Sequence, residues 1–244
     1  MSAFLAVYLR ELLILKRRLK RQLAGMAVSP LLYLLTFGYA LGRHLEVGGH
    51  SYLEFLVPGL IAMTSMTQGF SIAQDINIAR FYFCVFEEIQ AAPVSRLAYV
   101  MGEICAGLTR VALSVLVVIV LGGLFGVWPH YGLFFWLAVL LNGFTFSALA
   151  VALAMLVKSH ADQSLLTNFI ITPMAFLGGT FFPVENLPDW ARTLLSALPL
   201  THAAQAIRAD ALGGAPEWRP FAVLAATSLA CLILAVRTVE KARD

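Results

Sequence analysis

The stretch LFFWLAVLLNGFTFSALAVALAMLV, residues Leu133 to Val157, decides the fold class of this chain. It is continuously apolar and contains no charged side chain. A helix of about 20 residues crosses the roughly 30 Å of hydrocarbon in a bilayer. The strands of a membrane barrel would instead alternate apolar and polar side chains over about ten residues. The stretch therefore predicts a transmembrane α-helix.

The composition of the whole chain extends this prediction. Of its 244 residues, 60% are hydrophobic and 13% are charged, and the mean hydropathy is +0.82. In soluble domains roughly a quarter of the residues are charged. We expect an all-α integral membrane protein that forms a single transmembrane domain, residues 1–244. The six predicted spans are residues 26–41, 55–74, 104–126, 133–157, 165–182 and 221–236.

The lysines and arginines predict how these spans are oriented. Positive residues gather on the cytoplasmic side of short loops. With the N-terminus inside, 13 of the 17 Lys and Arg residues fall on the inner side and 4 on the outer side. Both termini are therefore expected in the cytoplasm. Against a signal peptide, 25 residues precede the first apolar run and no convincing small-residue cleavage pattern follows it, so we treat the segment as part of the mature protein.

Residues 1–25 predict an interfacial helix ahead of the first span. Apolar side chains recur at helical spacing from Phe4 to Leu19, and the cationic run KRRLKR, Lys16 to Arg21, overlaps their end. Such a helix would lie in the inner interface with its cations facing lipid phosphates. The charges alone would also serve as a simple topology anchor, and the two interpretations are compatible.

The connection between the fifth and sixth spans predicts two short helices. Pro188 and Asp189 can open the first helix, and Pro199 stops it. The second can run from Thr201 to the pair Gly213 and Gly214, where a left-handed cap costs least. Both helices are too short to cross a bilayer, so we expect them to be re-entrant or to lie on the surface.

Polar side chains inside the spans allow two interpretations. Hydroxyl and amide groups within membrane helices most often bond neighbouring helices together, and the alternative is that they line a translocation path. Arg110 either snorkels to the inner interface or serves gating and coupling. Pro173 can kink the fifth span. The candidates for a translocation path or a dimer interface are Thr64, Gln68, Asn168, Thr172, Pro173, Gly178 and Gly179.

Catalytic and nucleotide-binding motifs are missing from the sequence. It contains no HExxH, no paired cysteine motif and no GxxxxGK[ST] phosphate loop, and none of its four lysines follows a glycine. We therefore expect no catalytic residues, no metal site and no cofactor bound by this chain. If ATP drives the protein, another chain must bind it.

The connection FEEIQAAPVSRLAYVMGE, Phe86 to Glu103, is unusually polar for so apolar a chain. It carries three acids, an arginine and a proline between two apolar runs. The residues alone allow an ordinary hydrated loop or a contact with a soluble partner.

This connection, followed by an apolar span, resembles the cytoplasmic connection of type-2 ATP-binding cassette (ABC) exporter permeases. The run from Gly178 to Gly214 is similar to the signature that precedes the last span of that family. The VPGL run, Val57 to Leu60, and six spans with both ends inside also fit. Within the family, the chain looks closest to small bacterial permeases that include nodulation lipo-oligosaccharide exporters and drug or lipid exporters. Leu198 departs from the family pattern, which often has Asn there.

The resemblance implies a permease that pairs with a second copy and docks two cytoplasmic ATPase subunits, which bind ATP and Mg. It implies that the first cytoplasmic connection forms a coupling helix near Glu87 to Leu97. The second and fifth helices would line the path. The expected function is ATP-driven export of an amphipathic, lipid-like or lipid-linked substrate across the bacterial inner membrane. The side chains expected to face or shape the ATPase contact are Glu87, Glu88, Gln90, Pro93 and Arg96.

Two other classes of function stay open at the level of sequence. A secondary transporter or channel would work without an ATPase, although the shortage of acids within the spans speaks against it. A membrane enzyme acting on lipids would need a compact set of polar residues at one interface. The only seed for such a set is His202, Arg208 and Asp210.

Overall fold

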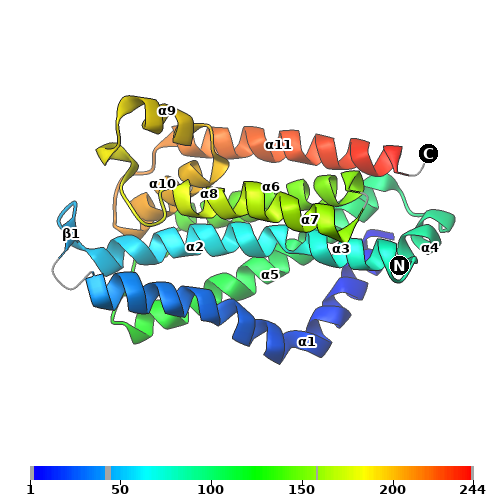
Figure 1. The fold of residues 1–244 in the computed structure, drawn as a ribbon, viewed down its shortest axis with the longest axis horizontal. Coiled ribbons are helices and arrows are strands. Elements are labelled where there is room, and N and C mark those ends of the chain that lie inside the picture. Colours follow the sequence, from blue (N-terminus) through cyan, green and yellow to red (C-terminus); the bar gives the residue numbers. More distant parts are fainter. Residues whose placement is uncertain (1–2, 42–44, 158, 243–244) are drawn as a thin grey trace.

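The computed structural model describes residues 3–41, 45–157 and 159–242, and most of these residues are helical. Within them, four helices are long and apolar enough to cross a membrane. They are the continuous pair α2 (Tyr52–Phe70) and α3 (Ile72–Phe81), then α5 (Arg96–Leu124), α6 (Leu133–Leu156) and α11 (Trp218–Lys241). They run along the long axis of the molecule (Figure 1). The prediction of a helical membrane protein is confirmed.

The first predicted span differs in form from these four. Helix α1 (Ala3–Tyr33) runs through residue 25 without interruption and continues as the π-helix η1 (Leu34–Leu41). Between Lys16 and Met26 the sequence offers no proline, and Gly25 alone costs too little to end a helix. The expected interfacial helix and first span are therefore one helix, which bends along its length (Figure 1).

The fifth predicted span is built from short pieces. They are α7 (His160–Leu166), the π-helix η3 (Thr167–Ile171) and α8 (Thr172–Leu177). The segment lies alongside the α2–α3 pair (Figure 1), with α8 packing on α2 and α7 packing on α3. Neither this segment nor α1 is among the four long apolar helices, so the count of six spans stays a prediction.

The two ends of the bundle carry different elements. Helix α4 (Val85–Ala91) lies at one end, together with the start of α1 and the end of α11 (Figure 1). The hairpin of β1 (Glu46–Val47) and β2 (His50–Ser51) lies at the other end. The glycines between these strands, Gly48 and Gly49, have φ of +61° and +82°, a backbone conformation that favours glycine in this turn.

The end opposite α4 also carries the two short helices. After the 3₁₀ turn η4 (Val184–Asn186) come α9 (Asp189–Ser196) and α10 (Pro199–Ala211), and the second helix begins at Pro199, two residues before the predicted Thr201. Helix α10 is largely buried and packs on α2, α6 and α11, whereas α9 buries only Leu195 among its described residues. One of the two is thus part of the packed core and the other is a surface helix.

Helix α2 forms the centre of the core. It packs on α5, α6 and α10, and small residues allow the close approach: a Cβ at Gly69 would lie 3.0 Å from the carbonyl oxygen of Gly143. Asn142 of α6 donates from Nδ2 to the Ala62 carbonyl (3.0 Å) and to Ser65 Oγ (2.7 Å). For Asn142, the interpretation that polar groups bond neighbouring helices is confirmed.

Candidate translocation cavity and coupling segment

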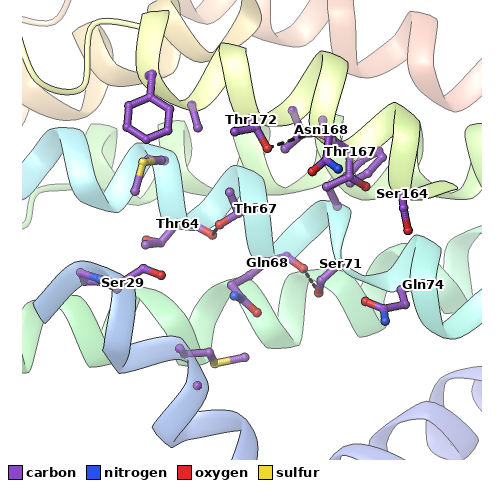
Figure 2. A pocket seen from close by; sticks show the side chains of 18 of the residues that line it. Ser29, Thr64, Thr67, Gln68, Ser71, Gln74, Ser164, Thr167, Asn168 and Thr172 are labelled. Carbon is purple, nitrogen blue, oxygen red and sulfur yellow. Dashed lines mark hydrogen bonds between the residues drawn. The ribbon is translucent and has the colours of Figure 1, made fainter. Parts of the chain in front are cut away.

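A cavity of about 520 Å³ lies between α1, the α2–α3 pair and the α7–η3–α8 segment. Figure 2 shows two rows of uncharged polar side chains on either side of it. One row belongs to α2 and α3, and the other to α7, η3 and α8. The first row consists of Thr64, Thr67, Gln68, Ser71 and Gln74. The second row consists of Ser164, Thr167, Asn168 and Thr172.

Helical spacing explains why each row faces the cavity. Side chains three or four positions apart lie on one face of a helix, and both rows follow this spacing. Apolar side chains complete the lining, among them Tyr33, Phe70 and Phe176. Among the described residues that line the cavity, His160 is the only one with a charged or imidazole side chain. The cavity therefore offers hydroxyl and amide groups beside aromatic surface.

The structure brings four of the seven predicted path residues together at this cavity. They are Thr64, Gln68, Asn168 and Thr172. Their role in transport stays a prediction, but they share one space.

The other three predicted path residues lie elsewhere. Pro173 is exposed at the start of α8. Gly178 ends α8 where Leu200 of α10 lies close, since a Cβ there would come within 2.6 Å of that side chain. Gly179 has φ of +77°, which favours glycine. These glycines serve the turn after α8 and its packing on α10.

Sequence reasoning missed part of the lining. Ser71 and Gln74 continue the spacing of Thr64, Thr67 and Gln68, so the signal for them was present in the sequence. Ser29 and Tyr33 come from α1, whose approach to the cavity is a tertiary contact that periodicity within one helix does not reveal.

A π-helical turn shapes the second wall. In η3 the amide of Thr172 bonds back five residues to the carbonyl of Thr167, and the Thr172 hydroxyl donates to the same oxygen at 3.2 Å. Pro173 follows and has no amide hydrogen to continue the ladder. Such turns are rare and often lie at functional sites.

The predicted coupling segment is shorter than the expected helix from Glu87 to Leu97. Helix α4 ends at Ala91, because Pro93 cannot donate and forces Ala92 into an extended conformation (φ −82°, ψ 153°). Ser95 then caps a new helix by accepting a hydrogen bond from the amide of Ala98 (3.2 Å). Arg96 is the first residue of α5, so it belongs to the long helix and not to α4.

The side chains of this segment divide into anchors and exposed groups. Phe86 is buried, with its ring 5.6 Å from that of Tyr99. Glu88 and Pro93 are exposed, and Arg96 forms an ion pair with Glu240 at the end of α11. The backbone of Glu87 and Gln90 lies in α4, but their side chains fall outside the described part of the structure.

Two exposed aromatic side chains precede α4 and were not predicted. Tyr82 and Phe83 are 69% and 66% exposed. Aromatic residues are enriched at the energetic centres of protein interfaces. The end of the molecule that carries α4 therefore presents aromatic as well as polar side chains.

Comparison with known proteins decides the family. The sequence pattern of the ABC-2 type transporter family matches residues 2–211. The chain belongs to the ABC-2 type transporter family.

Named relatives of this ABC-2 permease agree with the assignment. The inner membrane transport permease YadH of Escherichia coli (strain K12) is 27% identical over 247 residues, which cover 99% of this chain and 96% of YadH. Nodulation protein J of Rhizobium meliloti (strain 1021) is 30% identical over 213 residues, covering 86% of this chain and 81% of that protein. The resemblance to type-2 ABC permeases is thus confirmed.

Buried charges of this ABC-2 permease lie near the α4 end. Arg110 of α5 forms an ion pair with Asp75 of α3, and its side chain is only 5% exposed, so it does not snorkel. Glu103 of α5 and Glu11 of α1 are also buried. Burial raises the pKa of Glu11 above its usual range, and Arg10, whose Nη1 lies 3.4 Å from the carboxylate, opposes this. The Arg110–Asp75 ion pair joins α3 to α5.

The possible catalytic seed at the other end does not form a compact set. Arg208 donates to the carbonyls of Gly179 (2.9 Å) and Phe55 (3.3 Å). The Nε2 atom of His202 lies 2.8 Å from the Ser196 carbonyl. Asp210 accepts from the amide of Gly132 (2.8 Å). Each of the three residues thus binds separate backbone groups of the permease.

Proposed function

We propose that this chain is the transmembrane permease subunit of an ATP-driven exporter. The observation that carries the proposal is the cavity inside an ABC-2 chain, walled by two facing rows of polar side chains on α2–α3 and α7–α8. A path through a membrane protein needs polar groups that the substrate can contact one after another. These rows follow the long axis of the bundle (Figures 1 and 2).

The cargo is an amphipathic, lipid-like or lipid-linked molecule. Hydroxyl and amide groups suit an uncharged polar part, and the aromatic surface of Tyr33, Phe70 and Phe176 suits an apolar part. Binding sites of this mixed kind use apolar area for affinity and a few polar groups for orientation.

The partner is an ATPase that docks at the α4 end. Helix α4 is short, partly polar and held by the buried Phe86, and only four residues, Ala92 to Ser95, separate it from α5. A force on α4 therefore reaches a long helix directly. The Lys and Arg distribution supports a cytoplasmic position for this end, and the relative YadH, named an inner membrane transport permease, supports an inner-membrane location.

A second copy of the chain completes the exporter. The side chains of Leu165, Phe169 and Leu177 on the α7–η3–α8 segment are exposed and apolar. Pairing through this face would bring two cavities together about a two-fold axis. ATP binding would then draw the two ATPases together, move α4 and change which end of the cavity is open.

Copurification and transport assays test this proposal. The tagged chain is isolated from native membranes, and we expect an ATPase subunit with it and ATP-dependent export after reconstitution. A clean isolation without any ATPase, combined with transport by the purified chain in the absence of ATP, would overturn the proposal.

A secondary transporter is the second candidate, because one buried and one half-buried acid occur within the long apolar helices. Asp75 and Glu103 lie beside Arg110 near the α4 end. Intramembrane ionisable groups often serve ion coupling. Flux that follows an imposed ion gradient, in vesicles that contain only this chain, would favour this candidate over the exporter.

A further inference from the structure

The two walls of the cavity are joined near its α4 end by a pair of buried amides. Asn77 of α3 donates from Nδ2 to Oε1 of Gln163 on α7, across 3.0 Å. The two side chains are 0% and 4% exposed. Gln163 itself lines the cavity, and on the opposite wall the lining stops at Gln74, one helical turn before Asn77. The amides therefore meet where the α3 wall ends.

A ring contact connects the same two walls next to α4. The rings of Tyr82 and His160 meet edge to face, with centroids 6.3 Å apart. His160 begins α7 and lines the cavity, whereas Tyr82 follows α3. Two residues later Cys84 has φ of +51°, which is rare for a residue other than glycine, and α4 starts immediately after it. A movement of α4 therefore reaches the wall of the cavity through very few residues.

The chemistry of the amide pair suits a contact that opens. Asn77 Oδ1 and His160 Nδ1 are buried without a hydrogen-bond partner among the described residues. Buried polar atoms are nearly always paired, so leaving these two atoms unpaired costs free energy while the contact is closed. Water can bind both atoms once the contact opens. A lasting contact looks different: the hydroxyl oxygens of Thr145 and Ser228 lie 2.7 Å apart between α6 and α11, and both are within hydrogen-bond distance of the Leu141 carbonyl oxygen (2.8 and 3.3 Å).

We propose that the hydrogen bond between Asn77 and Gln163, here named the amide clasp, is the gate of the cavity at its α4 end. The ring contact of Tyr82 with His160 links this gate to α4. Substrate that moves between the cavity and the α4 side must separate α3 from α7 at this point. The gate follows from the contacts of α3 and α7, whereas its control by an ATPase on α4 rests on the proposed function.

Thiol labelling inside the cavity tests the clasp without any ATPase. A Thr67→Cys reporter lines the cavity, and a charged, membrane-impermeant maleimide is applied to sealed vesicles of both orientations. The native Cys84 is exposed beside α4, so its labelling identifies the vesicles whose α4 end faces the probe. Mass spectrometry then gives the labelling rate at residue 67 separately from that of Cys84.

Loss of the clasp should speed this labelling about tenfold, since a neutral hydrogen bond contributes up to about a factor of ten in an equilibrium constant. The variants are Asn77→Ala with Gln163→Ala, and separately Tyr82→Ala, which removes the ring contact with His160 from a side chain that is 69% exposed. Thr145→Val with Ser228→Ala removes a comparable buried bond that does not line the cavity, and should leave the rate unchanged.

The opposite change should close the gate. Cysteines at 77 and 163, bridged by a short reducible cross-linker, should abolish labelling at residue 67 from the α4 side, and reduction should restore it. Rates that are equal in the wild type, the clasp variants and the bridged protein would overturn the clasp, whether or not an ATPase copurifies. A clear response of the labelling rate, together with no copurifying ATPase and with transport in the absence of ATP, would instead keep the gate and reject the ATP-driven exporter.

Discussion

Arg110 is buried in an ion pair, and neither its burial nor its partner could be predicted from the sequence. Its partner Asp75 lies 35 positions earlier, just past the predicted second span, so periodicity within either helix does not indicate the pair. The sequence left snorkelling and coupling open, and only the packing of α3 on α5 reveals that the guanidinium is buried against a carboxylate. The same packing places an acid, Asp75, within one of the long apolar helices, where almost none was expected from the sequence.

The first prediction concerns this ion pair. Asp75→Asn leaves the buried guanidinium of Arg110 unpaired, so the free energy of unfolding should fall by about 3 kcal/mol. Asp75→Leu combined with Arg110→Met removes both charges and should recover most of that loss. Denaturant titration of the protein in detergent measures the difference. Equal stability of Asp75→Asn and wild type would mean that the pair does not stabilise the fold.

Arg208 carries the second prediction at this scale. It fastens α10 to the start of α2 and to the turn after α8, and its guanidinium lies 3.7 Å from the centre of the Phe55 ring. Lysine keeps the charge but lacks the planar fork, so Arg208→Lys should lower the free energy of unfolding by about 1–2 kcal/mol. The melting temperature in detergent checks this, with the exposed Arg192→Lys on α9 as the matched control.

At the scale of elements, apolar runs predict the presence of helices well. They predict where a helix ends only if the effect of a glycine or proline there is recognised. Helix α6 ends one residue before the predicted limit, Val157. The fifth run is apolar up to Phe182, yet its helix stops at Leu177, because Gly178 and Gly179 form a turn with a positive φ. Hydropathy does not distinguish an apolar helix from an apolar turn, and in α4 the effect of Pro93 was likewise underestimated.

Helix α4 carries the prediction at this scale. Glu87→Arg with Glu88→Arg reverses two charges of α4, where Glu88 is exposed, so the protein should stay folded and inserted, while the copurified ATPase and ATP-dependent export are lost. Asp189→Arg on α9, at the opposite end, reverses a fully exposed charge and should change neither quantity. Unchanged export by the double variant would place the ATPase contact elsewhere, for instance on Tyr82 and Phe83.

At the scale of the whole molecule, the cavity has ties at both ends. The amide clasp joins α3 to α7 near α4, and at the other end the Tyr52 hydroxyl donates to the Phe181 carbonyl (2.8 Å) while Arg208 bridges α2 and the turn after α8. The sequence indicated the polar faces of these walls because their spacing is local. It did not indicate the hydrogen bonds at the two ends. Two of them join residues at least 86 positions apart, and the third comes from Arg208 on α10.

Alternating access requires that these two ends respond to ATP in opposite directions. In vesicles that contain the permease with its copurified ATPase, a non-hydrolysable ATP analogue should slow maleimide labelling of Thr67→Cys from the α4 side and speed it from the α9 side. The physical reason is that an ATPase dimer closing on α4 favours one arrangement of α3 and α7, and a rigid wall cannot open at both ends without leaving a leak. Rates measured with ADP provide the control. If the labelling rates from both sides rise or fall together, the protein is a channel-like pore, which needs no gate that opens on one side at a time.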